Sequence, residues 1–176
     1  FTGMDALCHA FEAFASTAQS PITDLHALEA IRLVRKNLER ACLAPKELKT
    51  RSGMMLASLG AGLAFSNASL GIVHAMAHSL GGLLGFPHGE CNALLLGVAV
   101  EFNFDTIPER YSLAAEAMGI PISGMACAEV KKRLLETLAA FSKTLGINKT
   151  LKTMGCSRED LARLAENAMN DPCLVT

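Results

Sequence analysis

Hydrophobic and polar residues alternate along this chain with the three-to-four-residue period of amphipathic helices, and no stretch alternates as a half-buried strand would. Eight helices are predicted. They are expected over residues 4–17, from 23 or 24 to 43, 46–67, 71–84, 88–100, 108–118, 125–145 and 157–170. No internal repeat or low-complexity linker separates them. The pattern therefore predicts an all-α fold, a single bundle-like domain.

Local signals refine the ends and the burial of these helices. Thr23 or Asp24 is expected to cap the second helix, and residues 157–160 resemble a capping box at the start of the eighth. The later part of 46–67 and most of 88–100 are apolar on all sides. We therefore expect the third and fifth helices to be the most buried.

Composition excludes several classes of protein. The chain has 176 residues, a hydrophobic content of 51% and a formal charge of −1, so it is neither disordered nor a nucleic-acid-binding domain of the basic kind. No run of eighteen apolar residues is free of polar breaks, so no membrane partner is expected. Six cysteines are spread without a CxxC pair, which is typical of reduced thiols in a cytoplasmic protein.

The candidate chemistry lies in the histidines. Asp5 and His9 are four residues apart, as are His74 and His78, so each pair shares one helix face and can reach one metal ion. On an unbroken helix His88 would lie about 21 Å from His74, too far for one ion to bridge. The chain must turn back for His88 to join them.

The glycines at 81, 82 and 85, followed by Phe86 and Pro87, would permit that turn. An ordinary helix–loop–helix with incidental histidines explains the same residues. Among five candidate ligands, one should be a neighbour, because a catalytic metal keeps a coordination position open for substrate. Spacing does not identify which of the five it is.

Two segments carry a family resemblance. GMDALCHAFEAF, beginning at Gly3, and GIVHAMAHSLGGLLGFPHGECNALLL, beginning at Gly71, resemble the signature segments of the iron-containing (group III) alcohol dehydrogenases. GLAFSNASLGIVH and AMNDPCLVT fit the same family. The resemblance covers the whole chain. It implies the all-helical, dehydroquinate synthase-like C-terminal domain of a two-domain enzyme, whose N-terminal α/β domain binds NAD(P).

The same resemblance implies roles for individual residues. The metal ligands would be Asp5, His9, His74 and His88. His78 would stay unliganded beside the nicotinamide, as the candidate that passes the proton during metal-assisted hydride transfer, and Phe65 would lie near the same nicotinamide. The ion would be Fe²⁺, with Zn²⁺ or Ni²⁺ as alternatives.

The resemblance also implies a small primary alcohol or aldehyde as substrate and a homodimeric full-length enzyme. Because the chain starts without Met and ends soon after a helix stop, residues 1–176 are expected to be one metal-binding catalytic domain from a longer protein. On its own this domain would be inactive. Two alternatives remain: a helical metal-binding or structural module without activity, and a relative of the zinc polyol (glycerol-type) dehydrogenases.

Overall fold

The structure is a computed structural model that describes residues 1–175. Eight α-helices and two short 3₁₀ helices account for the ordered elements of these residues, and no strand occurs among them. In chain order they are α1 (Thr2–Ala15), α2 (Pro21–Leu43), α3 (Leu48–Ala68), α4 (Ile72–Leu84), α5 (His88–Asn103), η1 (Phe104–Thr106), α6 (Pro108–Ala117), α7 (Cys127–Thr144), α8 (Asp160–Met169) and η2 (Pro172–Val175). The predicted all-α fold is confirmed.

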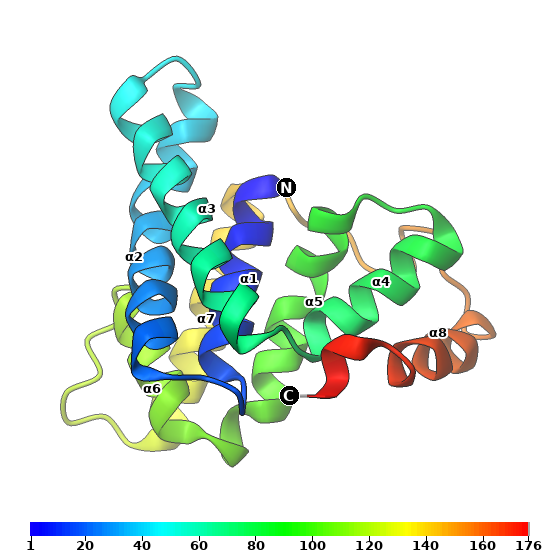
Figure 1. Ribbon diagram of the computed structural model, residues 1–176. Helices are drawn as coiled ribbons and strands as arrows, with labels where there is room; N and C mark the ends of the chain where they lie inside the picture. Colours follow the sequence, from blue (N-terminus) through cyan, green and yellow to red (C-terminus); the bar gives the residue numbers. More distant parts are fainter. Residues whose placement is uncertain (176) are drawn as a thin grey trace.

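The helices are arranged around α1. Figure 1 shows α2 and α3 as a long antiparallel pair on one side of α1, with α4, α5 and α8 on the other. Helix α1 packs against both members of the pair and against α5. Helix α4 packs against α5 and α8, and the C-terminal η2 packs against α4. The core therefore lies where α1 passes between the two groups of helices.

Helix α1 is the most enclosed helix, which corrects the expectation for the third and fifth. Nine of its residues are buried, and they cover almost its whole circumference: Met4, Ala6, Leu7, Cys8, Ala10, Phe11, Glu12, Ala13 and Phe14. Helix α3 instead buries a stripe of alanines at 57, 61, 64 and 68, and turns Leu56 and Leu59 toward solvent. Small residues let α3 approach its neighbours closely, so its large side chains remain outside. Helix α5 is buried along one side but exposes Phe102.

The second helix begins earlier than predicted, because its cap is Ser20. The Ser20 Oγ accepts the Thr23 N–H at 3.2 Å, and the Thr23 hydroxyl accepts the Ser20 N–H at 2.7 Å, which forms a capping box. Pro21 then occupies the first helical turn, where no N–H is needed. Before the eighth helix the predicted pair of capping hydrogen bonds is present: the Ser157 N–H donates to Asp160 Oδ2, and the Asp160 N–H donates to Ser157 Oγ. The α-helix itself starts only at Asp160.

The turn that returns His88 toward His74 is built at Gly85. This residue ends α4 in the left-handed conformation, with φ of 71°, where a side chain would be strained. Gly81 and Gly82 stay inside α4, so only the last of the three glycines makes the turn. Pro87 then precedes α5, and His88 is the first residue of that helix.

The structure also bears on the cysteines and on membrane insertion. All six cysteines are free thiols, and Cys8, Cys91 and Cys156 are buried. Among the described residues, no single helix has the length and apolar composition of a membrane span. Within the described part of the chain, only α3 and α4 taken together reach that length and composition, across a bend of 102°.

Candidate metal centre

Four side chains from three helices converge at one point. Helix α1 contributes Asp5 and His9 from consecutive turns of one face, α4 contributes His74, and α5 contributes His88. One ligand atom from each lies within 4.8 Å of those of the other three. The predicted convergence of His88 with His74 is therefore confirmed.

The distances suit a single ion. The Asp5 Oδ1 atom lies 3.5 Å from Nε2 of His88, 3.9 Å from Nε2 of His74 and 4.0 Å from Nε2 of His9. Donors held about 2.1 Å from a tetrahedral ion lie roughly 3.4 Å apart. A small contraction of this cluster would meet that requirement, and one carboxylate with three imidazoles is a donor set that first-row transition metals accept.

Burial keeps His9 and His88 in the neutral form that binds metals. It lowers the pKa of His9 to about 4, although the Asp5 carboxylate opposes the shift. Burial also lowers the pKa of His88, and the neighbouring imidazoles of His74 and His78 act in the same direction. His9 and His88 are therefore neutral at pH 7, and a metal would not have to displace a proton from either.

The side-chain amide of Asn92, on α5, contacts three of the four candidate ligands. Its Nδ2 atom lies 2.6 Å from Asp5 Oδ1, 3.0 Å from His74 Nε2 and 3.1 Å from His88 Nε2. Asn92 is fully buried, and its Oδ1 has no hydrogen-bond partner among the described residues. A buried polar atom without a partner is typical of a place where an ion or water binds. The Asn92 amide presents its nitrogen to these ligand atoms, so the fit of a bound cation rests on the donor set of one carboxylate and three imidazoles.

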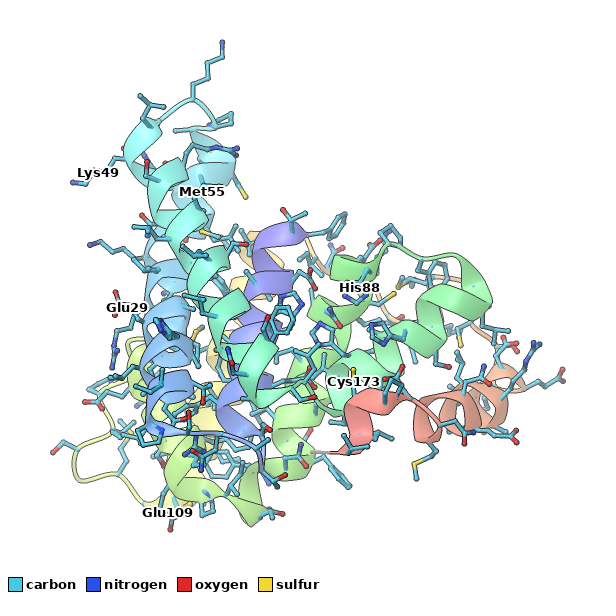
Figure 2. All side chains as sticks on the ribbon, viewed as in Figure 1. Glu29, Lys49, Met55, His88, Glu109 and Cys173 are labelled. Atoms are coloured by element: carbon cyan, nitrogen blue, oxygen red, sulfur yellow. The ribbon has the colours of Figure 1, made fainter. Side chains whose placement is uncertain are left out.

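His78 belongs to a second polar group next to the first. Its Nδ1 atom lies 2.9 Å from Asp171 Oδ2, and a ligand atom of Cys173 lies within 4.8 Å of the ligand atoms of both. The His78 ring stacks on the His88 ring, with centroids 5.3 Å apart. Figure 2 labels His88, at the start of α5, and Cys173, in the C-terminal η2. His78 is 43% exposed, and its ligand atoms group with those of Asp171 and Cys173 and not with the four-residue cluster.

Phe65, the other residue expected near the nicotinamide, packs against the cluster from α3. Its ring centroid lies 4.5 Å from that of His9, and the His9 ring also stacks on the His74 ring, with centroids 4.6 Å apart. The structure thus brings every predicted site residue into one region. The ligand and cofactor roles of these residues stay predictions.

Three polar residues of this region were not predicted: Glu12, Asn92 and Asp171. Glu12 contacts His74 Nδ1 and is described below. The signal for Asn92 was available, because it lies four residues after His88 and repeats the spacing of the Asp5 and His9 pair. Asp171 gave no such signal, since only the tertiary fold brings the end of α8 to α4.

Comparison with known proteins identifies the family. The profile of the Fe-containing alcohol dehydrogenase family, C-terminal, matches residues 1–176. The chain belongs to the Fe-containing alcohol dehydrogenase family. It is 42% identical to the 1,3-propanediol dehydrogenase of Klebsiella pneumoniae over 97% of its own length and 44% of that protein's.

Other members of the Fe-containing alcohol dehydrogenase family agree. The NAD-dependent methanol dehydrogenase of Bacillus methanolicus is 36% identical over 98% of this chain and 45% of its own length. The crystal structure of a 1,3-propanediol oxidoreductase superposes with a TM-score of 0.97 at 41% identity, over 99% of this chain and 46% of the other. The eight-helix domain is therefore the C-terminal domain of this family. The chain spans less than half the length of these relatives.

Proposed function

We propose that this chain is the metal-binding catalytic domain of an NAD(P)-dependent alcohol dehydrogenase, with Asp5, His9, His74 and His88 as the metal ligands. The observation that carries the proposal is the convergence of one carboxylate and three imidazoles from three separate helices. Incidental histidines on three helices have no reason to place their donor atoms within 4.8 Å of one another.

Fe²⁺ is the proposed ion, because the family is named for iron. Zn²⁺ and Ni²⁺ suit the same nitrogen and oxygen donors and bind such sites more tightly, so metal supply decides between them. A divalent ion held by these four residues would act as a Lewis acid on the oxygen of a bound alcohol or aldehyde. The protein's part is to hold the ligands, exclude other donors and leave one position for that oxygen.

His78 is proposed to move the proton. Asp171 holds its Nδ1 atom, which leaves Nε2 as the free nitrogen. The ring is exposed and stacks on His88, so it adjoins both the cluster and solvent. In the oxidation of an alcohol, the hydroxyl proton would pass to Nε2 of His78 and then to water, while the carbinol carbon gives up hydride and becomes a carbonyl.

The hydride acceptor is proposed to be NAD(P), bound chiefly by an N-terminal domain that precedes these residues in the full-length protein. Phe65, beside His9, would contact its nicotinamide. The relatives named for 1,3-propanediol and for methanol support a small primary alcohol, or the matching aldehyde, as the substrate. The full-length enzyme is expected to be a homodimer, which its sedimentation behaviour would show.

The test uses the full-length protein, purified without oxygen. We expect about one equivalent of metal in the wild type, much less in His88→Ala, and alcohol-dependent reduction of NAD(P) that a chelator abolishes. Equal metal content in the two proteins would remove His88 from the ligand set. Full activity of a metal-free preparation would refute the proposed function, and metal binding without any dehydrogenase activity would favour a helical metal-binding module.

A further inference from the structure

One buried carboxylate of α1 contacts the site without belonging to the four-residue cluster. Glu12 is 7% exposed and lies three residues after His9, so it shares the α1 face that carries Asp5 and His9. Its Oε2 atom contacts Nδ1 of His74, and its Oε1 atom accepts the Val73 N–H at 2.5 Å. Glu12 thus joins α1 to the first turn of α4.

We propose that Glu12 is a positioning residue: it fixes the tautomer and the ring orientation of His74, and thereby sets the affinity of the site for its metal. This inference rests on the proposed metal centre. An ionised carboxylate is an acceptor and has no proton to give, so the His74 nitrogen facing Glu12 must be the donor. His74 then carries its proton on Nδ1, and Nε2 keeps a lone pair.

That lone pair points into the cluster. His74 Nε2 lies 3.9 Å from Asp5 Oδ1, within the group of candidate ligand atoms. His74 is 1% exposed, so no solvent competes for either ring nitrogen. The Asn92 amide nitrogen lies 3.0 Å from Nε2 and faces it as a donor, so Glu12 at Nδ1 and Asn92 at Nε2 favour the same tautomer of His74. Partners of this kind commonly change metal affinity by about 10- to 100-fold when they are replaced.

The start of α4 is shaped to receive the carboxylate. A Cβ added at Gly71, the N-cap residue of α4, would lie 3.1 Å from Glu12 Oε1, so the glycine permits the close approach. The free N–H groups and the dipole of a helix N-terminus favour a negative charge at this place. Both Glu12 oxygens thus face nitrogen atoms of α4, Oε1 the Val73 N–H and Oε2 the His74 ring.

Glu12→Gln is the decisive variant, because it keeps the size and reverses one hydrogen bond. The Val73 N–H still needs an acceptor and takes the amide oxygen. The amide NH₂ then faces His74 Nδ1, and this favours the tautomer with the proton on Nε2, where the metal should bind. Glu90→Gln is the matched control, since Glu90 is also buried but pairs with Lys149, with 2.8 Å between Oε1 and Nζ.

The experiment measures two quantities on the full-length protein. Titration of the metal-free protein with Co²⁺ gives the affinity, and ¹⁵N chemical shifts of the His74 ring at pH 8 give the tautomer without any metal. We expect Glu12→Gln to bind Co²⁺ about 10- to 100-fold more weakly than wild type. The His74 tautomer should shift toward the form with its proton on Nε2, against the Asn92 amide that faces this nitrogen. Glu90→Gln should match wild type within twofold in affinity and keep the Nδ1 tautomer.

The outcomes separate this inference from the proposed function. Wild type that binds no Co²⁺ contradicts the metal centre, and the ring shifts still decide the tautomer claim. Wild type and Glu12→Gln binding equally, with the proton on Nδ1 in both, overturns the role of Glu12 alone. If Glu12→Gln does not fold, Glu12→Asp replaces it. That shorter side chain cannot reach both partners, so wild-type affinity in the Asp variant also overturns the inference.

Discussion

The Nδ1 atom of His78 lies 2.9 Å from Oδ2 of Asp171, although 93 residues separate the two in sequence. Asp171 also accepts the Cys173 N–H at 2.8 Å. Burial by itself would raise the pKa of Asp171, but the hydrogen bonds from Cys173 and His78 outweigh it and lower the pKa below its ordinary value. The carboxylate is therefore ionised at neutral pH and directs the free Nε2 of His78 away from itself.

Asp171→Asn should impair proton transfer without emptying the metal site. An amide at this position can present its NH₂ to Nδ1, which favours the His78 tautomer that has its proton on Nε2. We expect kcat for alcohol oxidation to fall about 10- to 100-fold, less than the roughly 10²- to 10⁴-fold that a general acid–base group contributes, because His78 itself remains. Steady-state kinetics with metal analysis checks this. The control is Asp105→Asn, which removes an exposed ion pair with Lys131 and should leave kcat unchanged. Wild-type kcat in Asp171→Asn would contradict a role for this pair.

Asn92→Asp should make the stability of the fold depend on metal. It places a second carboxylate beside Asp5, at a position where the amide nitrogen is now 2.6 Å from Asp5 Oδ1. Two like charges this close repel, and a cation between them relieves the repulsion. We expect the metal-free variant to lose about 2–4 kcal/mol of unfolding free energy, and Zn²⁺ to restore most of it.

The control for this prediction is a buried asparagine far from the cluster. Asn37 on α2 is 7% exposed, and its side-chain amide donates to the Leu33 carbonyl at 2.8 Å. Asn37→Asp should lose stability equally with and without Zn²⁺. Thermal unfolding in a chelator and in excess Zn²⁺ compares the two variants, and an equal loss for Asn92→Asp under both conditions would count against a cation site beside Asn92.

The metal-free protein should lose stability as the pH falls from 6.5 toward 4. The pKa of His9 in the folded state is about 4, against an ordinary value of 6.5, so in this interval the unfolded chain binds a proton that the folded protein does not. Stability is thus fully present above pH 6.5 and is lost as the pH falls. Allowing for partial exposure, His9 should account for about 1–2 kcal/mol. Chemical unfolding of metal-free wild type and His9→Gln from pH 8 to 4 measures it, and parallel curves would refute the assignment to His9.

The sequence predicted the helices well because their evidence is local. Apolar spacing located all eight, and glycine and proline located most of their ends. The error over α3 shows the limit of this reasoning. A helix that is apolar all round looks buried, but the alanines at 57, 61, 64 and 68 make the contact and leave Leu56 and Leu59 in solvent. Periodicity identifies an apolar face of a helix. The shape of the neighbouring helices decides which face is buried against them.

The candidate site divides in the same way. Pairs on one helix, such as Asp5 with His9, could be recognised from spacing alone, and the return of His88 followed from the turn. The residues that position these side chains could not be recognised from the sequence. In the sequence Glu12 is an ordinary polar residue of a helix, and Asp171 only marks the end of one. Their contacts with His74 and His78 exist because α1 and η2 pack against α4. These contacts belong to the tertiary fold.

Gly71→Ala should weaken metal binding through Glu12. The added methyl group would lie 3.1 Å from Oε1, and Glu12 cannot yield freely because Val73 and His74 hold its two oxygens. We expect a several-fold loss of Co²⁺ affinity, smaller than that of Glu12→Gln, and a destabilisation of about 1 kcal/mol.

Gly62→Ala is the matched control, since no atom lies within 4 Å of its added Cβ, and alanine in the middle of α3 should raise stability by up to about 1 kcal/mol. Opposite changes in the unfolding free energies of the two variants, with metal affinity reduced only in Gly71→Ala, are the expected result. Unchanged affinity in Gly71→Ala would show that Glu12 keeps its contacts when α4 is pushed away, and the close approach at Gly71 would then have no bearing on the metal centre.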